Sequence, residues 1–260
     1  MIDTHVHTAF SADSEASPRA LIERAIAMGM RYIALTDHQE NEFFPSAWTL
    51  DFDDYFSKMT ALRNEYRDRI TVAIGVEMGF APPCNEMAAK LISAYPFDTV
   101  INSVHNIDGI DLYQDTFYLD KTKDEAYETY LKLVDESVCA PYPYTQIGHL
   151  GYIARYARYE DKTLTYTSHA STIDSILKHI ADRGVILELN ASTDRGVCAT
   201  PTDILRRYYE LGGRKVAPAS DAHTVEKLGR KYGELVSLAK EIGFGGWTYA
   251  LGGKTLSAPF

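Results

Sequence analysis

The stretch MIDTHVHT (residues 1–8) opens the chain with a short apolar run that ends in two histidines, His5 and His7. Further apolar runs that end in a histidine or an acid are YIALTDHQE (32–40), ITVAIGVE (70–77), TVINSVHN (99–106), TQIGHLG (145–151) and VAPASDAHT (216–224). A buried strand that ends in an imidazole or a carboxylate delivers a metal ligand to one rim of a sheet or barrel, so several such strands converge on one pocket. Since no cysteine is among these donors, the implied ions are Zn, Mn or Fe. The pattern predicts a multinuclear metallohydrolase.

Strand-like and helix-like runs alternate along nearly the whole chain. Helical patterns cover residues 17–30, 53–69 and 171–184, and we expect seven strands near residues 1–4, 32–37, 70–77, 99–105, 145–149, 185–190 and 215–220. This alternation, with strands apolar on both faces, is typical of a parallel sheet covered by helices. A closed barrel brings the carboxyl ends of all these strands around one mouth, which an open doubly wound sheet does not. We therefore predict an α/β barrel that forms a single domain over residues 1–260.

Bulk composition narrows the partners of the protein. The 260 residues are 45% hydrophobic, carry a formal net charge of −10 and have a pI near 5.3. The acidic balance disfavours nucleic acid as a partner. Bound divalent ions would still attract a small anionic substrate, because they add positive charge locally in one cleft. The sequence is compatible with a homo-oligomer and does not specify one.

The three cysteines and the first residues point to a cytoplasmic protein. Cys84, Cys139 and Cys198 are scattered without a CxxC spacing, which favours reduced thiols over a disulfide framework. The opening MIDTHVHTAF has neither the basic segment nor the apolar stretch of a signal peptide. No apolar run approaches the roughly 20 residues that cross a bilayer. We expect no association with a membrane.

The spacing of the histidines favours metal binding over burial in a core. His5 and His7 alternate along a strand, so both side chains leave it on the same face. Burying both without an ion would require two separate sets of hydrogen-bond partners. Asp221 and His223 repeat this spacing in SDAH. Two imidazoles on one face, as His5 and His7 have them, suit a shared ion or pair of ions.

Other histidines and acids are interpreted from their neighbours. In TDH, His38 is the better ligand and Asp37 faces the other way, where it can orient a neighbour. His169 and His179 fit no ligand pattern and are expected at the surface. Glu188, in the strand VILELN, is expected to be structural.

The ordered set of these motifs resembles the polymerase and histidinol phosphatase (PHP) family of metallophosphoesterases, in its histidinol-phosphatase-like branch. In chain order the motifs are DTHVHTAFSADSE, ALTDH, GVE, SVH, GH and SDAH. The resemblance spans residues 3–223. It implies a distorted (β/α)7 barrel with two or three divalent ions (Zn, Mn or Fe) at the C-terminal ends of the strands. The ligand set that it implies is His5, His7, Asp13, His38, Glu77, His105, His149, Asp221 and His223.

The resemblance also divides these ligands among three sites. The first would use His5, His7, Glu77 and Asp221, and the second would share Glu77 and add His105 and His149. The third would use Asp13, His38 and His223. We expect Glu77, Asp221 and His223 to be the catalytic residues.

Substrate contacts are predicted from the segment after the GH motif. Arg155 and Arg158 lie in GHLGYIARYARYED, and a guanidinium suits a phosphate because it can bind two oxygens at once. We prefer Arg155 to Arg158. Asn190, at the end of VILELN, is expected to donate or accept hydrogen bonds at the pocket floor. Gly151 stands where relatives tend toward an aspartate, which leaves leaving-group recognition open.

The leading hypothesis is a metal-dependent phosphomonoesterase that hydrolyses L-histidinol phosphate, with a hydroxide bridging two ions as the nucleophile. Another small phosphate ester is an alternative, and a phosphodiesterase is disfavoured because the chain is acidic. An amidohydrolase would generally use a bridging carboxylated lysine, and the ligand-bearing strand ends carry none. A protein-tyrosine phosphatase would begin with a different loop from FSADSE. A metal-stabilised binding module would close its site with four local ligands, commonly cysteines.

Overall fold

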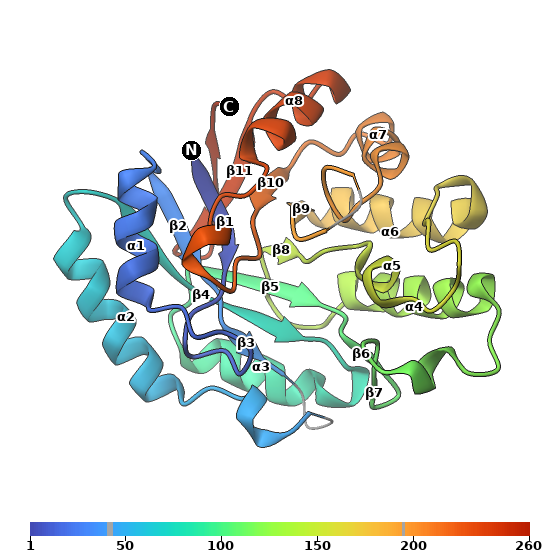
Figure 1. The fold of residues 1–260 in the computed structure, drawn as a ribbon, viewed down its shortest axis with the longest axis horizontal. Coiled ribbons are helices and arrows are strands. Elements are labelled where there is room, and N and C mark those ends of the chain that lie inside the picture. Colours follow the sequence, from blue (N-terminus) through green and yellow to red (C-terminus); the bar gives the residue numbers. More distant parts are fainter. Residues whose placement is uncertain (41–43, 194–195) are drawn as a thin grey trace.

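The computed structural model describes residues 1–40, 44–193 and 196–260. In this part of the chain seven parallel strands form a nearly closed barrel (Figure 1). In spatial order they are β1 (Ile2–Val6), β2 (Tyr32–Leu35), β4 (Thr71–Gly79), β5 (Thr99–Ser103), β8 (Gln146–Ile147), β9 (Ile186–Asn190) and β10 (Val216–Ala219). A two-residue strand, β3 (His38–Gln39), pairs with β4 beyond the end of β2. The predicted α/β barrel and its seven strands are confirmed.

The first strand and the segment after the last strand close the barrel. The His7 amide donates to the carbonyl of Ala222 at 2.9 Å, and the Asp221 amide donates to the carbonyl of His5 at 2.9 Å. The Thr4 hydroxyl donates to the carbonyl of Pro218 at 3.0 Å. These contacts place the two ligand pairs, from opposite ends of the chain, beside each other.

Helices lie around the strands in Figure 1. They are α1 (Pro18–Ala27), α2 (Phe52–Tyr66), α3 (Asn85–Ala94), α4 (Lys123–Val138), α5 (Tyr152–Tyr156), α6 (Ala170–Arg183), α7 (Thr202–Glu210) and α8 (Tyr232–Ile242). Single turns of 3-10 helix cover Ser46–Trp48, Pro82–Cys84, Asp115–Tyr118, Thr167–His169 and Val225–Lys227. Ser17 caps α1 through its side chain, and α6 ends at Gly184 with a φ of 63°.

Two hairpins were not predicted. The first pairs β6 (Asn106–Ile107) with β7 (Ile110–Asp111) across Asp108 and Gly109, whose φ values are 51° and 78°. The second pairs β11 (Trp247–Leu251) with β12 (Lys254–Ala258) across two glycines of positive φ. Asp-Gly and Gly-Gly are turn signals in the sequence, but the strands of the first hairpin are too short to show a period. In the described ranges, none of the helices has the length and apolarity needed to cross a bilayer.

Candidate metal centre

The two sides of the barrel seam bring His5, His7 and Asp221 together. The Nε2 atoms of His5 and His7 lie 2.9 Å apart, and both side chains are buried. Asp221 follows β10, and its Oδ1 lies 3.3 Å from His7 Nε2 and 3.9 Å from His5 Nε2. Asp221 adopts a φ of 51°, a conformation that asparagine and aspartate tolerate better than other residues with side chains. The Asp221 carboxylate lies beside His5, in β1, and His7, directly after it.

Glu77, near the end of β4, lies between two groups of histidines. Its Oε2 is 3.2 Å from His5 Nε2 and 3.0 Å from His38 Nδ1. Its Oε1 is 2.9 Å from His149 Nε2 and 3.2 Å from His105 Nε2. A carboxylate that offers one oxygen to each group has the geometry of a ligand shared by two ions.

Asp13, His38 and His223 form the outer edge of the cluster. Asp13 Oδ2 is 3.1 Å from His223 Nε2, and its Oδ1 is 3.8 Å from His38 Nε2. The ring of His223 stacks on that of His7 with centroids 4.0 Å apart. All nine residues predicted as ligands therefore lie in one cluster.

Three overlapping groups of donors in this cluster could each hold an ion. They are His5 with His7 and Glu77, His38 with Glu77 and His105, and His7 with His38 and His223, and the donor atoms of each group lie within 4.8 Å of one another. Glu77 Oε2, His38 Nδ1 and His223 Nε2 are buried and lie 3.0–3.1 Å from other polar atoms of the cluster, but among the described residues none of the three makes a hydrogen bond of normal geometry. Buried polar atoms are normally paired, so these three donors fit bound cations. Imidazole and carboxylate donors without thiolate suit Zn, Mn or Fe.

The surrounding charges favour the ligand form of both buried acids. Burial alone would raise the pKa of Glu77, but His5, His105 and His38 hold it well below its usual value. Burial likewise opposes ionisation of Asp221, while His5, His7 and Arg155 hold its pKa well below the usual value. Both groups are therefore carboxylates at neutral pH, as metal ligands must be.

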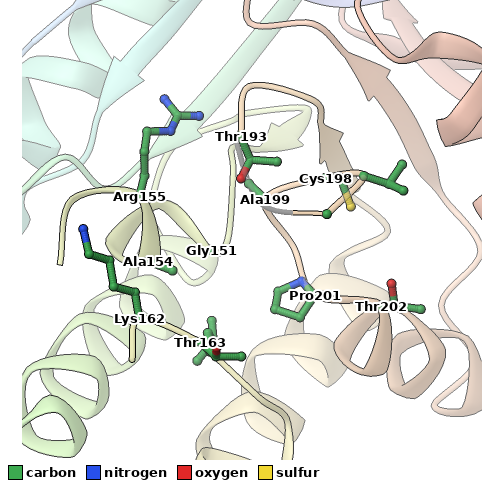
Figure 2. A pocket seen from close by; sticks show the side chains of 13 residues that line it. Gly151, Ala154, Arg155, Lys162, Thr163, Thr193, Cys198, Ala199, Pro201 and Thr202 are labelled. Carbon is green, nitrogen blue, oxygen red and sulfur yellow. The ribbon is translucent and has the colours of Figure 1, made fainter. Parts of the chain in front are cut away.

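The residues predicted to contact substrate occupy different places. Figure 2 shows the Arg155 side chain extending from α5 at the edge of a pocket that Gly151, Cys198, Pro201 and Thr202 also line and that includes none of the nine predicted ligands. Arg155 donates to the carbonyl of Ser192 and lies 3.4 Å from Asp221 Oδ2, so its guanidinium reaches the metal cluster.

Arg158 and Asn190 differ from Arg155 in this respect. Arg158 pairs with the exposed Asp115 and donates to two backbone carbonyls, away from the cluster. Asn190 is fully buried; its Nδ2 donates to Glu188 at 2.5 Å and lies 3.3 Å from Asp221 Oδ2. Asn190 therefore contacts the predicted metal ligand Asp221.

The sequence interpretation missed the carboxylates that contact the ligand histidines. Glu188 Oε2 is 2.9 Å from His5 Nδ1, and Glu40 Oε1 is 2.5 Å from His105 Nδ1. Both side chains are buried. Glu40 could have been found, because it follows His38 at the same alternate spacing as His5 and His7. The signal for Glu188 was an acid within a strand buried on both faces.

Two other expectations concern residues outside the cluster. His169, expected at the surface, is buried, and its Nδ1 lies 3.0 Å from Glu128. It satisfies its polar atom with a neighbour on α4, which the sequence pattern did not indicate. Asp37 has the orienting position predicted for it. Its Oδ1 accepts from Ser11 Oγ at 2.7 Å, and Ser11 Oγ lies 3.0 Å from His7 Nδ1.

The arrangement of the donors matches a known family. The PHP domain model matches residues 3–192. The chain belongs to the PHP domain family. A PHP domain with two to three divalent ions accounts for the clustered imidazoles and carboxylates described above.

Relatives of this PHP domain share most of its length. The histidinol-phosphatase of Lactococcus lactis subsp. lactis (strain IL1403) is 34% identical over 246 residues, which are 94% of this chain and 91% of that protein. A probable histidinol-phosphatase of Clostridium acetobutylicum is 33% identical over 92% of this chain and 93% of that protein. The crystal structure of the Lactococcus lactis histidinol phosphate phosphatase in complex with Zn, L-histidinol and phosphate superposes with a TM-score of 0.93. It is 33% identical and covers 98% of both chains.

Proposed function

We propose that this PHP domain is a metal-dependent phosphomonoesterase that hydrolyses L-histidinol phosphate to L-histidinol and phosphate. The observation that carries this proposal is the cluster of nine imidazole and carboxylate side chains, on a backbone that superposes over 98% of its length on a zinc enzyme holding L-histidinol and phosphate. The proposed ligands are His5, His7, Asp13, His38, Glu77, His105, His149, Asp221 and His223, with Glu77 shared between two ions.

The chemistry divides between the ions and the chain. Bound divalent ions supply Lewis acidity toward the phosphoryl oxygens and activate the attacking water. The chain contributes Arg155, whose guanidinium lies at the edge of the cluster and can bind phosphoryl oxygens. Glu77 and Asp221 stay ionised and balance the charge of the ions. No activated serine or cysteine is needed as a nucleophile.

A cavity above the cluster favours a cationic, aromatic leaving group. It measures about 310 Å³ and is lined by Asp13, His38, Glu40, Phe44, Trp48, His105, Asp111, Tyr113, Tyr152 and Tyr156. Its described lining residues include no lysine or arginine. L-histidinol carries an ammonium and an imidazole, which suit carboxylates and aromatic faces respectively.

The aromatic wall of this cavity runs from the cluster outward. The Tyr152 ring lies 4.7 Å from the His149 ring, and the Tyr156 ring lies 5.1 Å from that of Tyr152. Tyr113 continues the row at 5.4 Å from Tyr156. Asp111, on the β6–β7 hairpin, supplies a carboxylate at the same wall. An anionic leaving group such as a nucleotide would be repelled there.

The test is a substrate panel on the zinc- or manganese-loaded protein. We expect kcat/KM to be highest for L-histidinol phosphate, lower for p-nitrophenyl phosphate and lowest for bis-p-nitrophenyl phosphate. Faster turnover of the diester would refute phosphomonoesterase activity. Equal turnover of phosphotyrosine peptides and L-histidinol phosphate would refute the choice of substrate. A single domain over residues 1–260, a cytoplasmic location and any homo-oligomer stay predictions.

A further inference from the structure

His5 uses its two ring nitrogens in opposite directions. Its Nε2 faces the metal cluster, 2.9 Å from His7 Nε2 and 3.2 Å from Glu77 Oε2. Its Nδ1 faces Glu188 Oε2 at 2.9 Å. A neutral imidazole has one N–H and one lone pair, so a proton on Nδ1 leaves the lone pair on Nε2. The tautomer of His5 therefore decides whether its Nε2 can bind an ion.

Glu188 sits on β9 in the interior of the barrel and is fully buried. Its Oε2 also accepts from Gln146 Nε2 at 2.7 Å, and its Oε1 accepts from Asn190 Nδ2 at 2.5 Å. The same Asn190 Nδ2 lies 3.3 Å from Asp221 Oδ2. Among the described residues, no lysine or arginine pairs with Glu188. A buried carboxylate in that position is costly unless hydrogen bonds and nearby cations compensate it.

We infer that Glu188 is a positioning residue: it accepts a hydrogen bond from the Nδ1–H of His5 and so keeps His5 Nε2 as a metal ligand. This inference rests on the proposed metal-dependent function. It also accounts for the carboxylate at this place, since three neighbours point donors at it: His5 Nδ1, Gln146 Nε2 and Asn190 Nδ2. Carboxylate–histidine–metal arrangements of this kind fix the ring orientation of the ligand.

An amide cannot replace the carboxylate. Both carboxylate oxygens of Glu188 accept hydrogen bonds, whereas a glutamine side chain has one accepting oxygen and one donating NH2 group. If the amide oxygen faces His5, its NH2 meets the NH2 of Asn190. If the NH2 faces His5, it donates to Nδ1 and moves the imidazole proton to Nε2, where it blocks the metal. The first orientation keeps an acceptor for His5 only by an unfavourable contact with Asn190, and the second removes the acceptor, so Glu188→Gln weakens the positioning function in either case while nearly preserving the volume of the side chain.

The experiment measures zinc affinity without substrate, by competition with a chromogenic chelator, and thermal or urea unfolding with and without zinc. We expect Glu188→Gln to weaken zinc binding by about ten- to a hundredfold, as loss of a carboxylate that orients a ligand does. The zinc-dependent gain in the free energy of unfolding should fall by about 1.4–2.8 kcal/mol, which is that change in affinity converted at 1.4 kcal/mol per factor of ten. Glu188→Asp keeps two acceptor oxygens and should recover part of the affinity.

The matched control is Asp98→Asn. Asp98 is another buried carboxylate with three donors, and it lies at the start of β5, at the end of the barrel away from the cluster. Its Oδ2 accepts from the Ile74 amide at 2.8 Å and from Arg63, and its Oδ1 accepts from the Gly252 amide at 2.8 Å. We expect Asp98→Asn to lower stability equally with and without zinc, and to leave zinc affinity unchanged.

The outcomes separate the inference from the proposed function. If wild-type protein binds zinc and Glu188→Gln binds it equally well, the positioning function is refuted while the proposed function stands. If wild-type protein binds neither zinc, manganese nor iron, the proposed function itself fails. Should Glu188→Gln not fold, the 15N chemical shifts of the His5 ring in zinc-loaded wild-type protein decide the matter. The inference requires a protonated Nδ1, and a zinc-bound Nδ1 would overturn it.

Discussion

Replacing Arg155 tests how the chain binds the phosphoryl group. In the structure its guanidinium donates to the carbonyl of Ser192 and lies 3.4 Å from Asp221 Oδ2, while its buried Nε–H has no acceptor among the described residues. The guanidinium also lies over the rings of Tyr152 and Tyr156, at 5.4 and 5.8 Å from their centroids. Arg155 is thus held in place before substrate binds, with a donor still free.

The magnitude follows from the kind of contact that is lost. A charge-assisted hydrogen bond to a partly desolvated phosphate is worth about 1.5–3 kcal/mol. For Arg155→Ala we therefore expect kcat/KM to fall about ten- to 150-fold. Arg155→Lys should recover only part of this loss, because an ammonium supplies the charge without the planar pair of donors.

The assay combines turnover of L-histidinol phosphate with competitive inhibition by inorganic phosphate. Arg158→Ala is the control, because Arg158 pairs with Asp115 and donates to the carbonyls of Tyr113 and Tyr156 at 2.8 and 2.7 Å. Its loss should leave the phosphate inhibition constant unchanged, even if KM for the whole substrate rises. If Arg158→Ala weakens inhibition by phosphate and Arg155→Ala does not, the placement of Arg155 beside the phosphoryl group is wrong.

Three further predictions use the same assays. Asp111→Asn should lower kcat/KM for L-histidinol phosphate about fivefold, the effect of losing about 1 kcal/mol at a half-exposed ion pair, and leave p-nitrophenyl phosphate unaffected; a loss with both substrates would contradict it. Burial raises the pKa of Asp111. The preference of the wild-type protein for L-histidinol phosphate over p-nitrophenyl phosphate should therefore be complete above that pKa and be lost as the pH falls through it, at a higher pH than for an ordinary aspartate. Glu77→Gln should lower turnover more than about 100-fold and also lower the number of ions bound per chain, since a shared ligand matters more than one outer partner; turnover assays and elemental analysis check it. Chelation should abolish activity and lower the unfolding midpoint; an active protein with less than one ion per chain would refute the multinuclear centre.

The fold could be predicted largely from the alternation of elements, because strands buried on both faces and amphipathic helices have distinct periods. The closure of the barrel followed from one further step, namely that ligands on strands from the whole chain must meet. The short strands β3, β6 and β7 could not be found in this way, since two residues show no period. Their positions depend on hydrogen bonds to neighbours that are distant in sequence.

The donors of the candidate site were predicted better than their surroundings. His5, His7 and Glu77 stand out because a polar residue at the end of an apolar strand needs a reason to be there. Glu188 also lies in an apolar strand, but its function depends on β9 lying across the barrel interior from β1, which the sequence does not state. Arg155 and Arg158 lie three residues apart in the same segment, so the sequence alone does not show which of them faces the cluster. In the structure Arg155 lies in α5 and Arg158 lies after the end of this helix.

The distribution of charge around the cluster fits a centre of two or three divalent ions. Three of the proposed ligands are carboxylates: Asp13, Glu77 and Asp221. Three more carboxylates, Asp37, Glu40 and Glu188, contact the ligand histidines directly or through Ser11, and all three are buried. Together these acids can carry six negative charges, whereas Arg155 is the only arginine or lysine that pairs with one of them among the described residues. With Arg155 counted, the empty centre would carry five negative charges, whereas two divalent ions leave one negative charge and three leave one positive charge. A large unbalanced charge in a low dielectric is costly, so the site is suited to either number of ions. Filling the centre would bring the formal charge of the chain from −10 to about −6 with two ions or −4 with three, so part of the acidity of this sequence serves to hold cations.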